Sequence, residues 1–176
     1  MVVKTSQEDE LVSKWLIEEG FNVRKLEAQP HFKIAWGLDV YTQPPLHVNL
    51  KIFRPEGKDD RYVLLLGVAV SPEHKKKLSE LSAEEALRFS SKLMYRIISV
   101  CPTCNTGLQP SPIDLQAITV ARIIFRSELS ESYKPRFVEH VYTLINAFFT
   151  IVSTFNEEFP VIPPKTKAGK EPSTIL

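Results

Sequence analysis

The sequence is poor in cysteine, in glycine and in net charge. It has two cysteines and six glycines in 176 residues, and its 22 basic and 21 acidic residues leave a net charge of +1. Two cysteines exclude a disulfide-rich scaffold and are typical of a reducing compartment. The isolated glycines exclude a glycine-rich phosphate loop. The charge balance gives no electrostatic reason to expect nucleic acid or an anionic membrane as a partner.

Long apolar runs and targeting signals are also missing. The longest apolar run, Tyr62–Val70, is far too short to cross a bilayer. Residues 1–10 are polar and acidic and lack the apolar core of a signal peptide. We therefore expect a cytoplasmic protein that does not enter a membrane.

Catalytic motifs are absent as well. No Ser-His-Asp or Cys-His arrangement follows from the spacing of residues, and the adjacent pair Glu139 and His140 would point to different sides of a helix. The sequence thus predicts a protein that is not an enzyme and that needs no cofactor.

The first half of the chain predicts a helix followed by β-strands. Ser6 and Asp9 have the spacing of a capping box at the start of a helix that ends at Gly20. A short strand at 21–26 precedes a three-stranded antiparallel meander. Its strands are expected at Phe32–Tyr41, Val48–Phe53 and Arg61–Val70, where apolar residues alternate or dominate. Because the third strand is apolar on both faces, it should be central or covered on both sides.

The second half predicts helices on either side of one further strand. A short helix from Pro72 leads to Ser82 and Glu85, a second capping box that starts a helix ending near Val100. The apolar stripe of this second helix is Ala86, Leu87, Ser90, Leu93, Met94, Ile97 and Ile98. Residues 101–112 are rich in proline and are expected to be irregular, and Leu115–Phe125 is expected to be a strand.

A basic face is expected on that second helix, since Arg88, Lys92 and Arg96 are four residues apart. No aromatic residues interleave with these cations in the way that single-stranded nucleic acid requires. We interpret them as a solvated face in which Glu84 pairs with Arg88.

The last helix, at about 132–158, is more apolar than a single sheet face requires. Its polar residues fall on one narrow line: Glu139, Thr143, Asn146, Thr150, Ser153 and Glu157. The remaining apolar arc must be covered by another helix of the chain or by a second subunit, which predicts a homodimer. Residues 1–159 form one predicted domain, and residues 160–176 form a flexible tail rich in proline and lysine.

The sharpest local motif is Cys101-Pro102-Thr103-Cys104. This spacing suits a redox dithiol or a disulfide, half of a zinc site (including a four-cysteine site shared by two subunits) or a plain turn. The pair follows the end of a helix, where the dipole disfavours a thiolate, and the sequence has no second cysteine pair. A structural turn is therefore the favoured interpretation, with Cys101 and Cys104 kept as weak metal or redox candidates.

The order helix, three strands, helix, strand, long helix resembles the fold of type III secretion chaperones. The resemblance rests on the helix at 6–20, the strands at 32–70, the helix at 82–100, the strand at 115–125 and the last helix. The chain also resembles an uncharacterised archaeal family with this fold. These resemblances imply an α+β, homodimeric, non-enzymatic protein that binds other polypeptides, and they assign no functional residue.

The function predicted from the sequence is thus protein interaction of a chaperone- or adaptor-like kind. The expected interaction surface is Trp36, Tyr41, Phe53, Tyr62, Phe148 and Phe149. Two alternatives stay open. One is a metal- or redox-linked protein that uses Cys101 and Cys104. The other is a ligand-sensing domain with a pocket lined by Phe148 and Phe155 between the sheet and the last helix.

Overall fold

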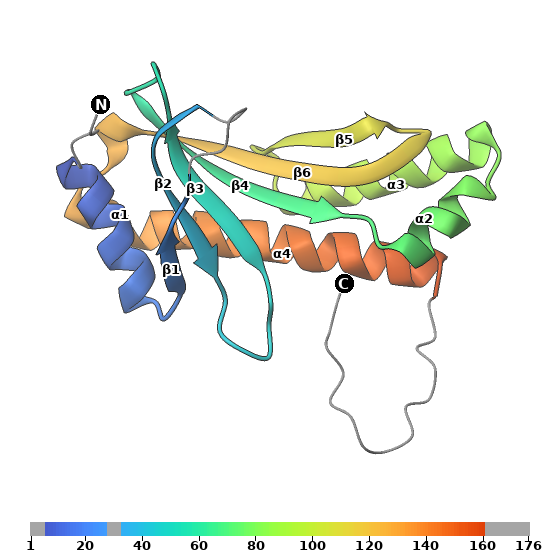
Figure 1. The fold of residues 1–176 in the computed structure, drawn as a ribbon, viewed down its shortest axis with the longest axis horizontal. Helices are drawn as coiled ribbons and strands as arrows, with labels where there is room; N and C mark the ends of the chain where they lie inside the picture. Colours follow the sequence, from blue (N-terminus) through green and yellow to red (C-terminus); the bar gives the residue numbers. More distant parts are fainter. Residues whose placement is uncertain (1–5, 28–32, 161–176) are drawn as a thin grey trace.

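In the part of the chain that the structure describes, six antiparallel strands form one sheet with helices on one of its faces (Figure 1). The structure is a computed structural model that describes residues 6–27 and 33–160. The strand order is β1-β2-β3-β4-β6-β5. The elements are α1 (Gln7–Glu18), β1 (Asn22–Lys25), β2 (Ile34–Tyr41), β3 (Asn49–Pro55), β4 (Arg61–Ala69), α2 (Pro72–Ser79), α3 (Ala83–Val100), β5 (Asn105–Ser111), β6 (Asp114–Phe125), η1 (Arg126–Glu128), η2 (Glu131–Tyr133) and α4 (Lys134–Glu158). The α+β class predicted from the sequence is confirmed.

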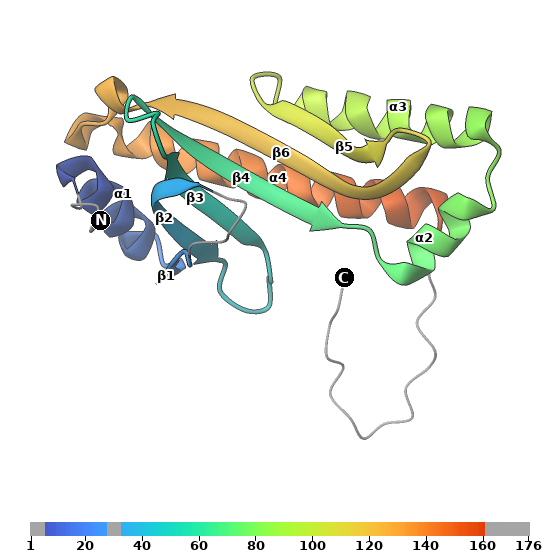
Figure 2. The same ribbon diagram turned by 45° about the horizontal axis from the view of Figure 1, so that its top comes forward.

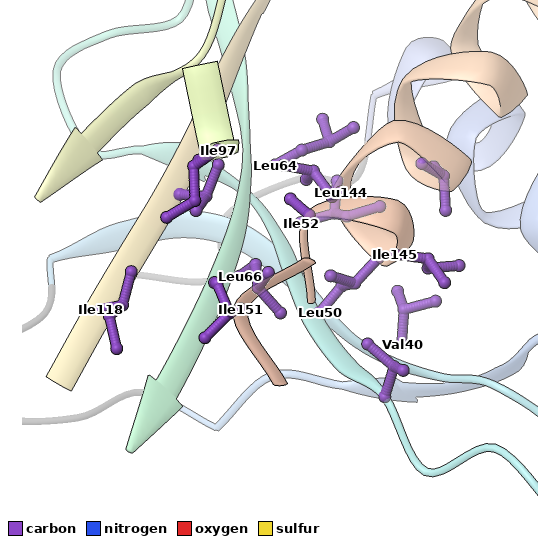
Figure 3. Close-up of a cluster of buried hydrophobic side chains, with 14 of the residues drawn as sticks. Val40, Leu50, Ile52, Leu64, Leu66, Ile97, Ile118, Leu144, Ile145 and Ile151 are labelled. Carbon is purple, nitrogen blue, oxygen red and sulfur yellow. The ribbon is translucent and has the colours of Figure 1, made fainter. Parts of the chain in front are cut away.

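The helices α1, α3 and α4 share one side of the sheet. Figure 2 shows α3 and α4 on the same side of β4 and β6, with α4 running along the length of the sheet. The core lies between the sheet and these helices. Leu64 of β4 meets Leu144 and Ile151 of α4 there (Figure 3), and each is at most 1% exposed. At the far end, Trp15 of α1 packs against Phe137 of α4 with ring centroids 5.4 Å apart. We call this helix-covered side the core face.

Most element boundaries follow the sequence pattern. Both capping boxes form, at Ser6 with Asp9 and at Ser82 with Glu85. The strand predicted at 61–70 is β4, and it is central because β3 and β6 flank it. Phe32, expected at the start of the second strand, and residues 161–176, expected to be a flexible tail, lie outside the described residues. No helix in the described parts of the chain has the length and hydropathy needed to cross a membrane.

The prediction that residues 101–112 are irregular is wrong. They contain β5, which pairs with β6 in antiparallel register, for example Leu108 with Ile118. Pro110 led to the error because proline has no N–H to donate to the hydrogen bonds between strands. β5 is an edge strand, and its register shifts between Gln109 and Pro110, which is where a sheet tolerates proline.

The surplus apolar arc of α4 is covered largely by α3 of the same chain. Phe89 of α3 packs edge-on against Phe155 and Phe159, with ring centroids 5.0 and 4.8 Å away. Beside these rings, Arg96 pairs with Glu157 at 2.5 Å. The first of the two expected covers, another helix, is therefore the one seen. Some apolar surface on α4 stays open, since Phe149 is 40% exposed.

The basic residues of α3 are paired with acids, as expected for a solvated face. Arg88 lies 3.0 Å from Glu84, and Lys92 lies 3.0 Å from Glu157. The cations on this side of α3 are therefore largely neutralised by neighbouring carboxylates.

Helix α1 is held to the sheet by a buried carboxylate. Asp9 is 0% exposed and accepts hydrogen bonds from the Tyr62 hydroxyl at 2.6 Å, from Arg54 Nη2 at 3.1 Å and from the backbone N–H of Ser6 at 2.8 Å. One carboxylate therefore caps α1 and joins it to β3 and β4. Arg54 also donates to Asp59 at 2.7 Å, so its buried charge has two acidic partners. Such a charge is tolerated in a core only when it is paired in this way.

Removing the hydroxyl in Tyr62→Phe should lower the free energy of unfolding by about 2 kcal/mol, because the buried carboxylate loses a donor while the ring keeps its shape. Tyr142→Phe is the matched control, since Tyr142 is 46% exposed and lies outside this cluster. Urea unfolding followed by circular dichroism measures both. Equal midpoints for Tyr62→Phe and the wild type would contradict the role given to this hydroxyl.

A second ion pair joins α1 to the segment after β6. Arg126 Nη2 lies 2.7 Å from Glu8, and this hydrogen bond lowers the pKa of Glu8 from 4.5 to about 2. The folded state thus favours the ionised carboxylate. The pair stabilises the fold fully above about pH 4.5, and this contribution is lost as the pH falls toward about 2.

We expect a carbon-13 NMR titration to place the Glu8 carboxyl pKa near 2 in the wild type and close to 4.5 in Arg126→Gln. Arg88→Gln is the control, because Arg88 is 79% exposed and pairs with Glu84 instead. A Glu8 pKa that stays low in Arg126→Gln would show that another group sets it.

Candidate interaction surface

The face of β4 and β6 that points away from the helices is mostly apolar, and part of it is exposed. It consists of Val63, Leu65, Gly67, Ala69, Ala117, Thr119, Ala121, Ile123 and Phe125, and we call it the open face. These residues lie opposite one another in register, for example Val63 with Ile123 and Leu65 with Ala121. Ile123 is 40% and Phe125 48% exposed. No helix among the described residues covers this face (Figure 2).

The open face is bulky at one end and flat at the other. Ile123 and Phe125 stand at the bulky end, while Gly67, Ala69 and Ala117 make the flat end. A Cβ built on Gly67 would meet no heavy atom within 4 Å, so the space above it is open. The flat end therefore lets another backbone approach the sheet closely.

Polar and packed residues bound the open face. At its bulky end, the Arg61 guanidinium lies 5.5 Å from the Phe125 ring centroid. Toward β2 and β3, Lys51 pairs with Asp39 at 2.8 Å. On this side of the sheet, the exposed apolar surface of the described residues therefore lies on β4 and β6.

The structure does not bring the six predicted surface residues together. Tyr62 is fully buried on the core face, and Trp36 packs edge-on against it with ring centroids 5.8 Å apart. Phe53 is on the outer side of β3 but only 7% exposed. The expectation that Tyr62 and Phe53 lie on an exposed face is therefore wrong. The alternation of residues along a strand shows which side chains share a face, but it does not show which face the rest of the chain covers.

The other predicted residues lie apart from one another. Tyr41 is half-buried at the end of β2, with the Arg24 guanidinium 5.6 Å from its ring centroid. Phe148 and Phe149 pack against each other on α4, with ring centroids 5.6 Å apart, on the helical side of the molecule. Ile123 and Phe125 were not among the residues predicted from the sequence. The apolar character of 115–125 on both faces could have identified them, as it did for β4.

A second exposed apolar surface is the outer stripe of α3, formed by Leu87, Ser91, Met94, Tyr95 and Ile98. Leu87 is 50%, Tyr95 74% and Ile98 47% exposed. The sequence placed Leu87, Met94 and Ile98 in one stripe with the buried Leu93 and Ile97. The structure divides this stripe into a buried inner half and an exposed outer half, because α3 packs against α4 along one side only.

Cys101 and Cys104 form a disulfide bond in the turn between α3 and β5. Cys101 is 1% exposed, whereas Cys104 is half-buried. The segment is a turn, and the disulfide within it is the alternative that the sequence left open beside a plain structural turn. Within the described residues, no group of three or more His, Cys, Asp or Glu side chains is arranged to hold a metal ion.

The two residues expected to line a ligand pocket, Phe148 and Phe155, pack against other aromatic side chains. Phe155 is 5% exposed, and the His74 ring centroid lies 5.2 Å from its own. Two shallow grooves lie elsewhere. One of about 410 Å³ is lined by residues that include Leu81, Phe89 and Phe159, and one of about 360 Å³ lies between α1 and β2.

The buried histidine of α4 has few polar partners. His140 is 5% exposed, and its Nε2 lies 3.3 Å from the Tyr133 hydroxyl. Burial, followed by the nearby Arg122 charge, lowers the pKa of His140 below its ordinary value of 6.5. Within the described residues, the His140 imidazole makes no hydrogen bond to a carboxylate, which fits a packing role.

The chain belongs to a family described as uncharacterized conserved proteins (DUF2299), whose model matches residues 8–155. It is also similar to an uncharacterized protein from Methanothermobacter thermautotrophicus, known from its crystal structure, with 25% sequence identity and a TM-score of 0.73. The similarity covers 86% of this chain and 99% of the other. No curated protein matches the chain. An uncharacterised family was thus identified correctly from the sequence.

Proposed function

We propose that the protein is a non-enzymatic, chaperone- or adaptor-like module that binds another polypeptide on its open face. The observation that supports this most directly is the uncovered apolar surface of two central strands. Exposed contiguous apolar surface on a folded protein marks an interaction site. Central strands are usually covered, so an open pair with Ile123 at 40% and Phe125 at 48% exposure calls for a partner.

The shape and charge of the open face fit a polypeptide better than a small molecule or a nucleic acid. Small ligands bind in concave sites, whereas this face is flat around Gly67 and Ala69. Nucleic acid needs several cations for its phosphates, and two cations beside the face are paired with acids: Arg61 with Asp60 at 2.7 Å and Lys51 with Asp39 at 2.8 Å. The apolar side of an amphipathic helix suits such a face, as α4 does on the other side of the same sheet.

The proposal agrees with the resemblance to type III secretion chaperones, which implies a homodimer that binds polypeptides. It also places the protein in the cytoplasm, where such partners are encountered during synthesis. No residue is transferred from those chaperones, and the surface is defined by this chain alone.

Photo-cross-linking tests this function. p-Benzoylphenylalanine placed at Leu65 on the open face should capture one polypeptide in an extract of the native host. The same group at Ile113, which is 57% exposed in the turn between β5 and β6, should not capture it. Once the captured polypeptide is purified, Ile123→Lys should weaken its binding by more than about 30-fold, equivalent to about 2 kcal/mol, in isothermal titration calorimetry.

Ile113→Lys is the matched control for affinity and should bind as the wild type does. Equal capture from both positions, or equal affinity of both lysine variants, would exclude the open face as the binding surface. Both variants should keep the wild-type melting temperature, since both side chains are already exposed.

We also propose a homodimer, formed through the outer stripe of α3. A two-fold axis places the same surface on both subunits. If two copies of α3 cross antiparallel at the middle of the stripe, Leu87 lies opposite the second copy's Ile98, and Ser91 lies opposite its Met94. A small residue then faces a large one, as helix packing requires.

Light scattering on a size-exclusion peak should give twice the chain mass at micromolar concentration. Ile98→Glu should give a monomer, because two-fold symmetry places an unpaired charge in each half of an apolar interface. Phe149→Glu, which changes the exposed side of α4, is the control and should stay dimeric. A wild-type monomer would refute the dimer, and a monomeric Phe149→Glu would move the interface to α4.

A further inference from the structure

The turn between α3 and β5 differs from the rest of the molecule in chemistry. It holds the two cysteines of the chain, joined as a disulfide, and two exposed residues, Pro102 and Thr103. The open face and the outer stripe of α3 do not use it. Its two sulfurs also differ in access, since Cys101 is 1% exposed and Cys104 is half-buried.

A cation lies beside this turn. Arg122 Nη1 donates to the Thr103 hydroxyl at 2.5 Å. In the antiparallel pairing of β5 with β6, Asn105 lies opposite Ala121. Continuing this register by one residue places Cys104 opposite Arg122. Within the described residues, no carboxylate lies within 4.0 Å of the Arg122 guanidinium. An unpaired guanidinium lowers the pKa of a neighbouring thiol and favours its thiolate.

The two cysteines therefore have opposite environments. Cys101 caps the C-terminus of α3, where the negative end of the helix dipole disfavours a thiolate. Cys104 is beyond the cap, beside Arg122 and closer to solvent. A dithiol with one accessible, activated sulfur and one buried sulfur is the arrangement used for exchange with external thiols.

The turn is also held by bonds that do not involve sulfur. The N–H of Cys101 donates to the Ile97 carbonyl at 2.9 Å, and the N–H of Cys104 donates to the Cys101 carbonyl at 3.1 Å. The Arg122–Thr103 hydrogen bond is a third such contact. None of the three requires the disulfide, so opening the disulfide removes none of them directly.

We propose that the Cys101–Cys104 turn is a thiol–disulfide exchange site that reacts with small-molecule thiols and disulfides through Cys104. In the oxidising direction, the Cys104 thiolate attacks one sulfur of a small disulfide, and one small thiolate leaves. Cys101 then loses its proton and attacks the Cys104 sulfur, so the second small thiolate leaves and the protein disulfide closes. The dithiol loses two electrons and two protons, and the small disulfide becomes two thiols.

The first test uses the full-length protein in buffers with graded ratios of reduced to oxidised glutathione. Samples are quenched with acid, alkylated with N-ethylmaleimide under denaturing conditions and weighed by mass spectrometry. We expect the doubly alkylated fraction to rise and fall reversibly with the ratio, with an unchanged circular dichroism spectrum. A disulfide that opens only in denaturant, or thiols that stay reduced in excess oxidised glutathione, would overturn the proposal.

The second test separates the two sulfurs. Cys101→Ser leaves the Cys104 thiol alone, and Cys104→Ser leaves the Cys101 thiol alone. At pH 7 the Cys104 thiol should react with iodoacetamide at least about tenfold faster, which is the ratio expected for a thiol pKa lower by one unit. Equal rates, or a faster Cys101, would overturn the assignment of Cys104.

Arg122 is tested as a positioning residue by the pH profile of the same reaction. In the Cys101→Ser protein, Arg122→Gln should move the midpoint of Cys104 alkylation to higher pH, and Arg122→Lys should restore it. Arg136→Gln, on the exposed side of α4, is the control and should leave the midpoint unchanged. A purely structural role for Arg122 would change the melting temperature and leave the midpoint in place, which would exclude its effect on the thiolate.

Discussion

The chain has enough helix to cover one face of its sheet, while its two central strands carry apolar side chains on both faces. Helices α1, α3 and α4 cover the core face, and the residues buried there include Leu64, Leu66 and Ile118, each at most 1% exposed. The same strands present Val63, Leu65 and Ile123 on the other side. Removing apolar surface from water contributes roughly 25 cal/mol per Å², so a complex in which a partner covers this face is stabilised. The proposed polypeptide binding follows from this imbalance.

A single carboxylate coordinates the position of the first helix. Asp9 caps α1 and at the same time accepts from Tyr62 and Arg54 of neighbouring strands. A charge in a core is costly unless it is paired and hydrogen-bonded, so these three hydrogen bonds favour this position of α1 on the sheet. The Glu8–Arg126 pair fixes the same end of α1 to the segment after β6. Together they make the α1 end polar and specific, while the opposite end of the sheet relies on the aromatic contacts of Phe89.

The fold class and most elements could be predicted from the sequence because they depend on local periodicity and on caps. The boundaries of α3 and α4 agree with prediction to within two residues at each end. The error at β5 has a local cause, since proline content was weighed without knowing that the segment would lie at a sheet edge. The candidate site was predicted poorly, because alternation along a strand gives two faces without saying which one the helices cover.

Exposure thus divides what the sequence determined from what the tertiary structure decided. The sequence determined the strands, the helices, the capping boxes and the doubly apolar character of β4, since each depends on residues close together in the chain. Only the tertiary structure decided that Tyr62 is buried with its hydroxyl bonded to Asp9, 53 residues away, and that Ile123 is open to solvent. It also placed Arg122 beside the Cys101–Cys104 turn, through the pairing of β5 with β6. The physical reason is that burial and charge pairing depend on which distant segments meet, and periodicity alone carries no such information.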